Sequence, residues 1–261
     1  MNIERVPASH GWLWITHGYR LIMRNPLHAL GLAMLLPLGM YLAILIPVVG
    51  APLAVIIMPV LLAGYMRVCR ALEFHQKVEV IHLFQGFEQR TPQLLALGAL
   101  LLSGTLLISI IITMVGGRAL AELPDSMRAA GDDPYALISA MLSTAPSVTL
   151  SLLIGLALLL PLMLAFQFAP MLVFFDKHAP LAAMRTSLTA ILRNIAPFVV
   201  YSLILQGIAL LAAQIPYDLG LVLMLPLGLT SLYVGYRDIF PTPVAMDVTA
   251  DNTPGAEPPA P

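Results

Sequence analysis

The sequence carries very little charge. Asp, Glu, Lys and Arg make up 10% of its 261 residues, whereas hydrophobic residues make up 59%. A soluble globular domain carries about 25% charged residues. This composition, with a mean hydropathy of +0.89, therefore predicts an integral membrane protein. The net charge of −1 leaves no basic excess, so we expect no nucleic-acid partner.

Cysteine is almost absent as well. Cys69 is the single cysteine, which excludes an internal disulfide and a zinc site built from cysteines. The first ten residues contain no apolar run after their charges, so we expect no cleavable signal peptide. The first apolar segment of the chain is instead expected to direct insertion into the membrane.

Six apolar segments are long enough to cross the bilayer core, which requires about 20 residues. They are predicted near Leu27–Ile46, Pro52–Cys69, Gln93–Val115, Val148–Phe175, Pro197–Ile215 and Leu219–Tyr236. Short turns join the first two segments and the last two, so each of these pairs is predicted to form a tight hairpin. A longer polar connection, residues 116–146, joins the third segment to the fourth.

The positions of Lys and Arg predict how these segments are oriented. With the N-terminus in the cytoplasm, 11 of the 13 Lys and Arg are cytoplasmic, and only Arg118 and Arg128 lie outside. We therefore predict a multi-pass protein of the bacterial inner membrane with both termini in the cytoplasm. The periplasmic insertion, residues 116–146, is predicted to carry a short helix, Pro134 to Leu142, packed on the outer surface. Residues 241–261 are rich in Pro and Ala and are predicted to be a disordered cytoplasmic tail.

The stretch from Gly11 to Asn25 predicts an amphipathic helix lying in the membrane surface. Its polar residues share one narrow arc of a helical wheel; they are Thr16, His17, Arg20 and Arg24. Aromatic side chains at the headgroup boundary and basic side chains near an anionic leaflet are typical lipid contacts. The candidate interfacial lipid contacts, on this helix and on its counterpart described next, are Trp12, Trp14, Tyr19, Arg20, Arg24, Arg185 and Arg193.

The same wheel recurs 169 residues later, in Leu181–Asn194. At this offset every position of the polar arc meets another polar residue, and the turn sequence Ile46-Pro47 meets Ile215-Pro216. A middle copy is weaker and rests on Arg90-Thr91-Pro92, which echoes Arg24-Asn25-Pro26.

The repeat predicts an all-α integral membrane protein with six transmembrane helices in three parallel repeat units. Each unit consists of an interfacial amphipathic helix plus a transmembrane hairpin. The units cover about residues 9–72, 78–178 and 179–238 of a single membrane domain, residues 1–240.

Two family resemblances agree with this architecture. The opening VPASHGWLWITHGYRLIMRNP resembles an uncharacterised family of proteobacterial six-span inner-membrane proteins, through the pattern V-P-A, G-W-x-W and N-P. A second, shorter motif is similar to the membrane domain attached to bacterial glycerophosphodiester phosphodiesterases; it comprises Asp176, Pro180, Ala183, Ser187 and Asn194. Those enzymes carry their chemistry on a separate soluble domain that has no room here, so this resemblance implies architecture and no activity.

Motifs with catalytic or metal-binding chemistry are missing. No ionisable residue lies near the middle of a predicted span, and HExxH and CxxC are absent. We therefore predict no catalytic residue, no cofactor, no metal and no enzymatic activity. The six histidines all fall on the cytoplasmic side, where a solvated interfacial role and a metal or pH-sensing cluster are the alternatives.

Gln167 and Gln206 are candidate intramembrane polar contacts, because a buried amide needs a hydrogen-bond partner. They are expected either to join helices through a hydrogen bond or to line a conduit. Our leading hypothesis is a non-enzymatic inner-membrane protein that organises lipids or partner proteins. The alternative is a small transporter or channel with a path between the repeat units. The expected partners are membrane lipids, and a membrane protein or a second copy of the chain is the further candidate.

Overall fold

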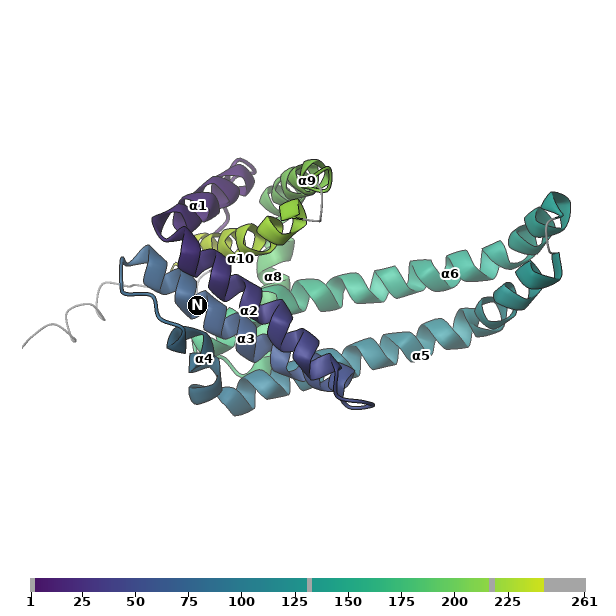
Figure 1. Cartoon of the computed structure of the whole chain (residues 1–261), viewed down its shortest axis with the longest axis horizontal. Coiled ribbons are helices and arrows are strands. Elements are labelled where there is room, and N and C mark those ends of the chain that lie inside the picture. The colour runs from purple at the N-terminus through teal and green to yellow at the C-terminus, as the bar shows by residue number, and fades with distance from the viewer. Residues whose placement is uncertain (1–2, 131–132, 216–218, 242–261) are drawn as a thin grey trace, which may run out of the picture.

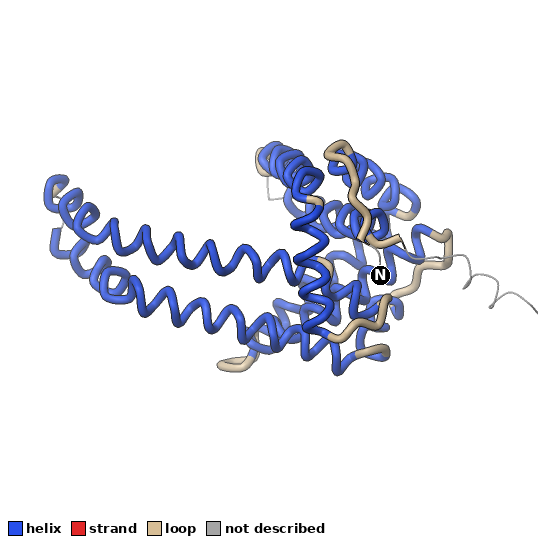
Figure 2. Tube along the Cα trace, turned by 180° about the vertical axis from the view of Figure 1, so that it is seen from behind, coloured by secondary structure: helices blue, strands red, loops and turns tan. Residues whose placement is uncertain are grey.

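The protein is described by a computed structural model covering residues 3–130, 133–215 and 219–241. These residues form α-helices and no strand (Figures 1 and 2). The helices of the first half are α1 (His10–Arg24), α2 (Pro26–Ile44), α3 (Gly50–Glu73), α4 (Ile81–Glu88) and α5 (Thr91–Ala130). Those of the second half are α6 (Pro134–Gln167), α7 (Ala169–Phe174), α8 (Pro180–Arg193), α9 (Ile195–Ala212) and α10 (Leu219–Ile239).

The predicted surface helix and first hairpin are present as α1, α2 and α3. Asn25 separates α1 from α2; its side chain caps α2, and Pro26 follows at the first helical position, where a missing N–H costs nothing. The turn between α2 and α3 depends on Gly50, because a Cβ there would lie 2.3 Å from the carbonyl oxygen of Ala43. The hairpin therefore closes tightly, as its short turn predicts.

The hairpin of α5 and α6 is longer than predicted and projects from the rest of the molecule (Figure 1). The expected short helix from Pro134 to Leu142, packed on the outer surface, is wrong: these residues are the start of the 34-residue helix α6. Asp133 caps this helix by accepting from the backbone N–H of Tyr135 at 3.0 Å. The 40-residue α5 is about 60 Å long, twice the bilayer core, so the hairpin extends beyond a membrane that it crosses.

The span predicted near Val148–Phe175 is interrupted where α6 gives way to α7. Pro170 has no N–H to donate to the preceding turn, and α6 ends at Gln167. The hydroxyl of Ser187 fills the gap, because it accepts from the N–H of Phe168 at 3.1 Å and donates to the carbonyl of Leu164 at 2.8 Å. A side chain of α8 is thus inserted into the hydrogen-bond ladder of the helix on which it packs.

Five helical segments of the described residues are long and apolar enough to cross a membrane. They are Pro26–Ile44, Gly50–Glu73, Thr91–Gly117, Ala145–Phe174 and Ile195–Ala212. They correspond to the first five predicted spans. The segment predicted as the sixth span is helical, as α10, but it is not among these five.

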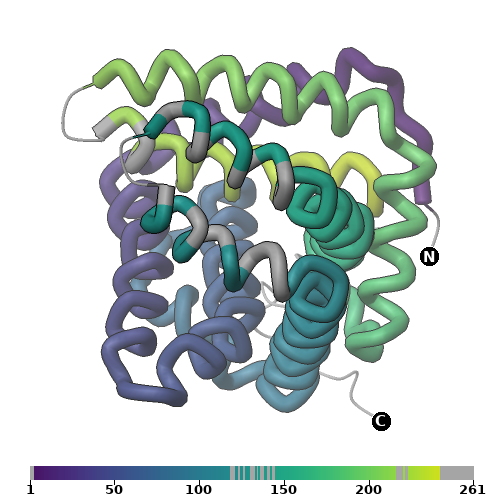
Figure 3. The backbone as a smooth tube through the Cα atoms, turned by 90° about the vertical axis from the view of Figure 1, so that its right-hand side faces the viewer, coloured from purple at the N-terminus to yellow at the C-terminus, as the bar shows by residue number. Residues whose placement is uncertain are grey.

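The three helical hairpins diverge from a common base. In Figure 3, α5 and α6 point towards the viewer, α2 and α3 run down the picture, and α9 and α10 run across it. The core lies at the base, where the ends of α3, α7 and α10 meet. Its largest fully buried side chains include Trp14, Tyr65, Phe168, Tyr233, Tyr236 and Phe240. Edge-to-face contacts such as Phe168 with Phe240, 5.7 Å between ring centroids, hold this base together.

Candidate functional site

Helix α1 presents one buried face to α9 and α10. The buried positions are Gly11, Trp14, Ile15, Gly18, Leu21 and Ile22. The two glycines allow the helices to approach closely: a Cβ at Gly18 would lie 2.7 Å from the backbone nitrogen of Ser231. The predicted amphipathic helix is therefore attached to the protein along one side.

Trp14 is a correction to the predicted lipid contacts, because only 2% of its surface is exposed. It packs edge-to-face on Phe198 with a centroid distance of 5.1 Å, and its indole N–H donates to Asp238 at 2.8 Å. The helical wheel placed Trp14 with the apolar residues correctly, but the face on which it lies is covered by protein. Trp12 and Tyr19 remain 52% and 55% exposed, and their lipid contact stays a prediction.

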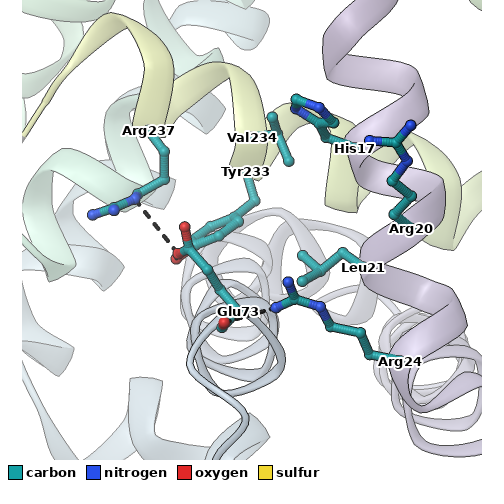
Figure 4. Close-up of a pocket in the computed structure, with 8 residues that line it drawn as sticks. All are labelled: His17, Arg20, Leu21, Arg24, Glu73, Tyr233, Val234 and Arg237. Atoms are coloured by element: carbon teal, nitrogen blue, oxygen red, sulfur yellow. Dashed lines mark hydrogen bonds and ion pairs between the residues drawn. The ribbon is translucent and has the colours of Figure 1, made fainter.

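A basic cleft opens beside α1, between this helix and the ends of α3 and α10 (Figure 4). Its volume is about 360 Å³. The lining residues are His17, Arg20, Leu21, Arg24, Glu73, Tyr233, Val234 and Arg237. We call this the basic cleft. It brings together two of the predicted lipid contacts, Arg20 and Arg24, with residues that are distant in the sequence.

Glu73 is the acidic residue of the basic cleft and already has partners. It accepts a hydrogen bond from the Tyr233 hydroxyl at 2.5 Å, and its carboxylate lies 3.5 Å from Nε of Arg237. That Nε is buried and makes no hydrogen bond with a described residue, and the guanidinium lies over the ring of Phe74. Glu73 thus ties the end of α3 to α10.

The three basic side chains that α1 supplies to the cleft differ in their engagement. Arg24 donates to the backbone carbonyls of Leu72 at 2.9 Å and Glu73 at 2.7 Å, and so closes the end of α3. Arg20 and His17 make no hydrogen bond or ion pair within the described ranges, residues 3–130, 133–215 and 219–241. Their donors are available to a ligand in the cleft.

A smaller cavity of about 260 Å³ adjoins the basic cleft and shares four of its residues. Here Asp238 accepts from Trp14 and lies 2.7 Å from Nδ1 of His10. The first residues of the chain lie close by, because the N–H of Glu4 donates to the carbonyl of Ile239 at 3.0 Å. The start of the chain and the end of α10 are therefore in direct contact.

The counterpart helix α8 has no such cleft among the described cavities. Arg185 and Arg193 are exposed on its surface, and their contact with lipid stays a prediction. Asn194, which follows α8, accepts from the N–H of Val6 at 2.9 Å and donates to the carbonyl of Glu4 at 3.0 Å. Asn194 thereby fixes the segment that leads into α1.

The two glutamines are not brought together. Gln167 ends α6 and is half-buried, whereas Gln206 lies on the exposed side of α9. Neither side chain has a hydrogen-bond partner in the described part of the chain. The two roles expected for them, an interhelical hydrogen bond and the lining of a conduit, both stay predictions.

Sequence reasoning missed the role of the acidic residues that organise the base, although it named Asp176 as part of a family motif. The carboxylate of Glu73 binds α10, that of Asp238 binds α1, and Asp176 accepts a hydrogen bond from Tyr236. Burial raises the pKa of Asp176, and the hydrogen bond from Tyr236 partly offsets this effect. A usable signal existed, because all three lie within four residues of the end of a predicted span in a chain with few acidic residues.

The histidines do not form a metal centre within the described residues, where no group of three or more His, Cys, Asp or Glu is placed to hold an ion. The polar groups that do converge are guanidinium, imidazole and a single engaged carboxylate. This donor set suits an anion rather than a cation.

Comparison with known proteins supports the membrane character that the apolar helices indicate. The chain is 29% identical over 260 residues to a probable inner membrane protein of Burkholderia thailandensis; the match covers 92% of this chain and 94% of that protein. The chain is a transmembrane protein. No protein-family model matches it, and no solved structure does. The similarity to the phosphodiesterase membrane domain is not supported by these comparisons and stays a resemblance of about twenty residues.

Proposed function

We propose that this chain is a non-enzymatic inner-membrane protein with six spans and two cytoplasmic termini, which organises lipids or partner proteins at the cytoplasmic surface. The observation that carries the topology is the contact between the two ends of the membrane domain. Glu4 is hydrogen-bonded to Ile239, and His10 lies against Asp238. Residues in contact outside the bilayer lie on the same side of it.

This contact supports an even number of membrane crossings between residue 4 and residue 239. Five apolar candidates lie between them. If all five cross, one more crossing is needed, and α10 is the remaining long helix (Leu219–Ile239). The excess of Lys and Arg on the same side as the termini favours the cytoplasm for that side.

Three features support the repeat units. The same positions of α1 and α8 are buried at the offset of 169, as in the pairs Trp14 with Ala183 and Gly18 with Ser187. The ends of α3 and α7 both turn through a residue with positive φ, at His75 and Lys177. These two residues are separated by the same number of positions as Pro59 and Pro161, the prolines inside α3 and α6.

The third feature is that each surface helix packs on the second spanning helix of the preceding unit. Helix α4 lies on α3, where a Cβ at Gly64 would meet the carbonyl of Leu83 at 1.8 Å. Helix α8 lies on α6 through Ser187, and α1 lies on α10 through Gly18. The units therefore follow one another in a closed ring, with the last joined to the first.

The filled base favours organisation of lipids or partners over transport. Where the ends of α3, α7 and α10 meet, the space is occupied by aromatic rings such as Phe168 and Tyr236, 6.3 Å apart. A path between the units would have to pass through this packed region. The open polar feature of the described residues is instead the basic cleft at its edge.

Reporter fusions test the topology. Fusions after Asp132 and after Pro254 are expected to report the periplasm and the cytoplasm respectively, in cells that express the full membrane domain. The reverse pattern, or the same side for both, would contradict the proposed arrangement.

The transporter alternative is tested separately, by solute flux in proteoliposomes that contain the purified protein. We expect no flux above that of empty vesicles. Flux that disappears in a stably folded Gln206→Leu variant would favour the conduit.

A further inference from the structure

We propose that the basic cleft is a binding site for the phosphate group of an anionic phospholipid in the cytoplasmic leaflet. This proposal rests on the proposed function only in placing the cleft at the cytoplasmic membrane surface. It goes further by assigning a ligand class, a site and the side chains that hold it.

The charge in the cleft is positive. Three guanidinium groups, from Arg20, Arg24 and Arg237, face a single carboxylate, that of Glu73. This carboxylate is already engaged by Arg237 and by the Tyr233 hydroxyl. The guanidinium of Arg24 donates to neutral carbonyls, so its charge is not cancelled by an acidic side chain. An anion entering the cleft therefore meets uncompensated positive charge.

The donors that would contact the anion are Arg20 and His17. They lie one turn apart on α1, line the cleft, and have no partner among the residues of the described ranges (Figure 4). A guanidinium presents two parallel N–H groups that match two phosphate oxygens. The cleft volume of about 360 Å³ falls within the range of small-ligand sites. The geometry and the chemistry both suit a phosphodiester.

A lipid phosphate fits better than a free one because the cleft has an apolar wall and an apolar neighbour. Leu21 and Val234 line it. The adjacent face of α1 exposes Trp12, Tyr19 and Met23 at 52%, 55% and 48% of their surface. Such a stripe is typical of a helix immersed at the headgroup level. A headgroup in the cleft would leave its acyl chains beside this stripe.

The test is titration of the purified full-length protein in detergent with phosphatidylglycerol, with phosphatidylcholine as the zwitterionic reference, followed by native mass spectrometry. Arg20→Gln is expected to weaken phosphatidylglycerol binding about fivefold, the change that corresponds to about 1 kcal/mol for one basic residue near an anionic lipid. Arg20→Lys should retain part of the affinity that Arg20→Gln loses. Because Arg20 has no partner in the described residues, the variant should keep the melting temperature of the parent.

Two further variants separate a site from general attraction. Lys77→Gln removes a side chain that is 87% exposed and does not line the cleft, and it should leave the affinity unchanged. Arg193→Gln removes the repeat equivalent of Arg24 from α8, whose one described cavity has no basic residue in its lining. If Arg193→Gln weakens phosphatidylglycerol binding as much as Arg20→Gln does, the proposal is overturned, because the basic surface would then attract lipid without a specific site.

Inorganic phosphate distinguishes the two sources of the ligand. We expect millimolar phosphate to leave bound phosphatidylglycerol in place. Binding of inorganic phosphate that depends on Arg20, without binding of phosphatidylglycerol, would overturn the lipid assignment. If neither inorganic phosphate nor phosphatidylglycerol binds, the proposed site is overturned. Neither result would reverse the reporter fusions, so the proposed topology is tested independently.

Discussion

Trp12 and Trp14 are two residues apart and have opposite environments. The sequence predicts both as lipid contacts because both fall among the apolar positions of the wheel. In the structure, Trp14 is packed on Phe198 and bonded to Asp238, whereas Trp12 is half exposed. A wheel separates polar from apolar positions, but it cannot tell an apolar face covered by protein from one covered by lipid.

This difference makes the two tryptophans a matched pair. Trp14→Phe keeps an aromatic ring but removes the indole N–H that donates a hydrogen bond to Asp238. The loss of a donor to a half-buried carboxylate costs about 1–3 kcal/mol, so we expect the apparent melting temperature to fall by several degrees. Trp12→Phe should change it by less than about one degree, since exposed substitutions cost little. Thermal unfolding of both variants in one detergent measures the effects, and equal shifts would contradict the assignment of Trp14 to the core.

At the level of helices, the sequence is most informative where apolar length and turn residues coincide. The α2–α3 hairpin is predicted from two apolar runs around a short turn with Gly50, and the structure has it. The continuity of α5 and α6 through the polar connection is missed. Nothing local in residues 118–130 is apolar enough to mark a span, and helix pairing beyond the membrane leaves no clear periodic signal.

The break between α6 and α7 shows the same limit. Pro170 marks a weak point in the helix, but the residue that fills the gap, Ser187, comes from α8. Sequence reasoning placed Ser187 in a family motif without a structural role. Its role depends on a contact between segments that no local pattern contains.

Gly64 tests the packing of α4 on α3. A Cβ at this position would lie 1.8 Å from the backbone carbonyl of Leu83, which a side-chain rotation cannot relieve. Gly64→Ala should therefore displace α4 and cost about 1–3 kcal/mol, the usual cost of overpacking. The same substitution at Gly31, where a Cβ would have nothing within 4 Å, should be neutral or stabilising, because alanine favours a helix over glycine. Thermal unfolding that ranks Gly31→Ala below Gly64→Ala in stability would contradict the α3–α4 contact.

At the scale of the whole molecule, the proposed repeat rests on the sequence, but the order of the contacts between its units cannot be found there. The offset of 169 relates Gly18 to Ser187, two small residues that each sit at a close helix contact. Gly18 touches Ser231 of α10 and Ser187 touches Leu164 of α6, which belong to other units of the proposed repeat. The basic cleft is missed for the same reason. Arg20 is predicted as a surface residue, and its neighbours Glu73 and Arg237 arrive from helices remote in the sequence.

The arrangement of the third hairpin is the feature on which the six-span topology depends. Helices α9 and α10 run across the direction of α5 and α6 (Figure 3), and α10 is not among the five apolar candidates. In the proposed topology, the contact between Glu4 and Ile239 lies outside the bilayer and goes with an even number of crossings. The side of the membrane on which the C-terminal end of α9 lies decides whether α9 and α10 both cross it.

Cysteine labelling at Gln214, the exposed residue just after α9, measures this directly. Cys69 is fully buried, so the parent protein provides an unlabelled baseline. A membrane-impermeant maleimide applied to intact spheroplasts should label Gln214→Cys, whereas Lys77→Cys should be labelled only after lysis. That pattern is the one expected of six spans with cytoplasmic termini. Labelling of Gln214→Cys only after lysis would place both ends of α9 in the cytoplasm and contradict the six-span topology.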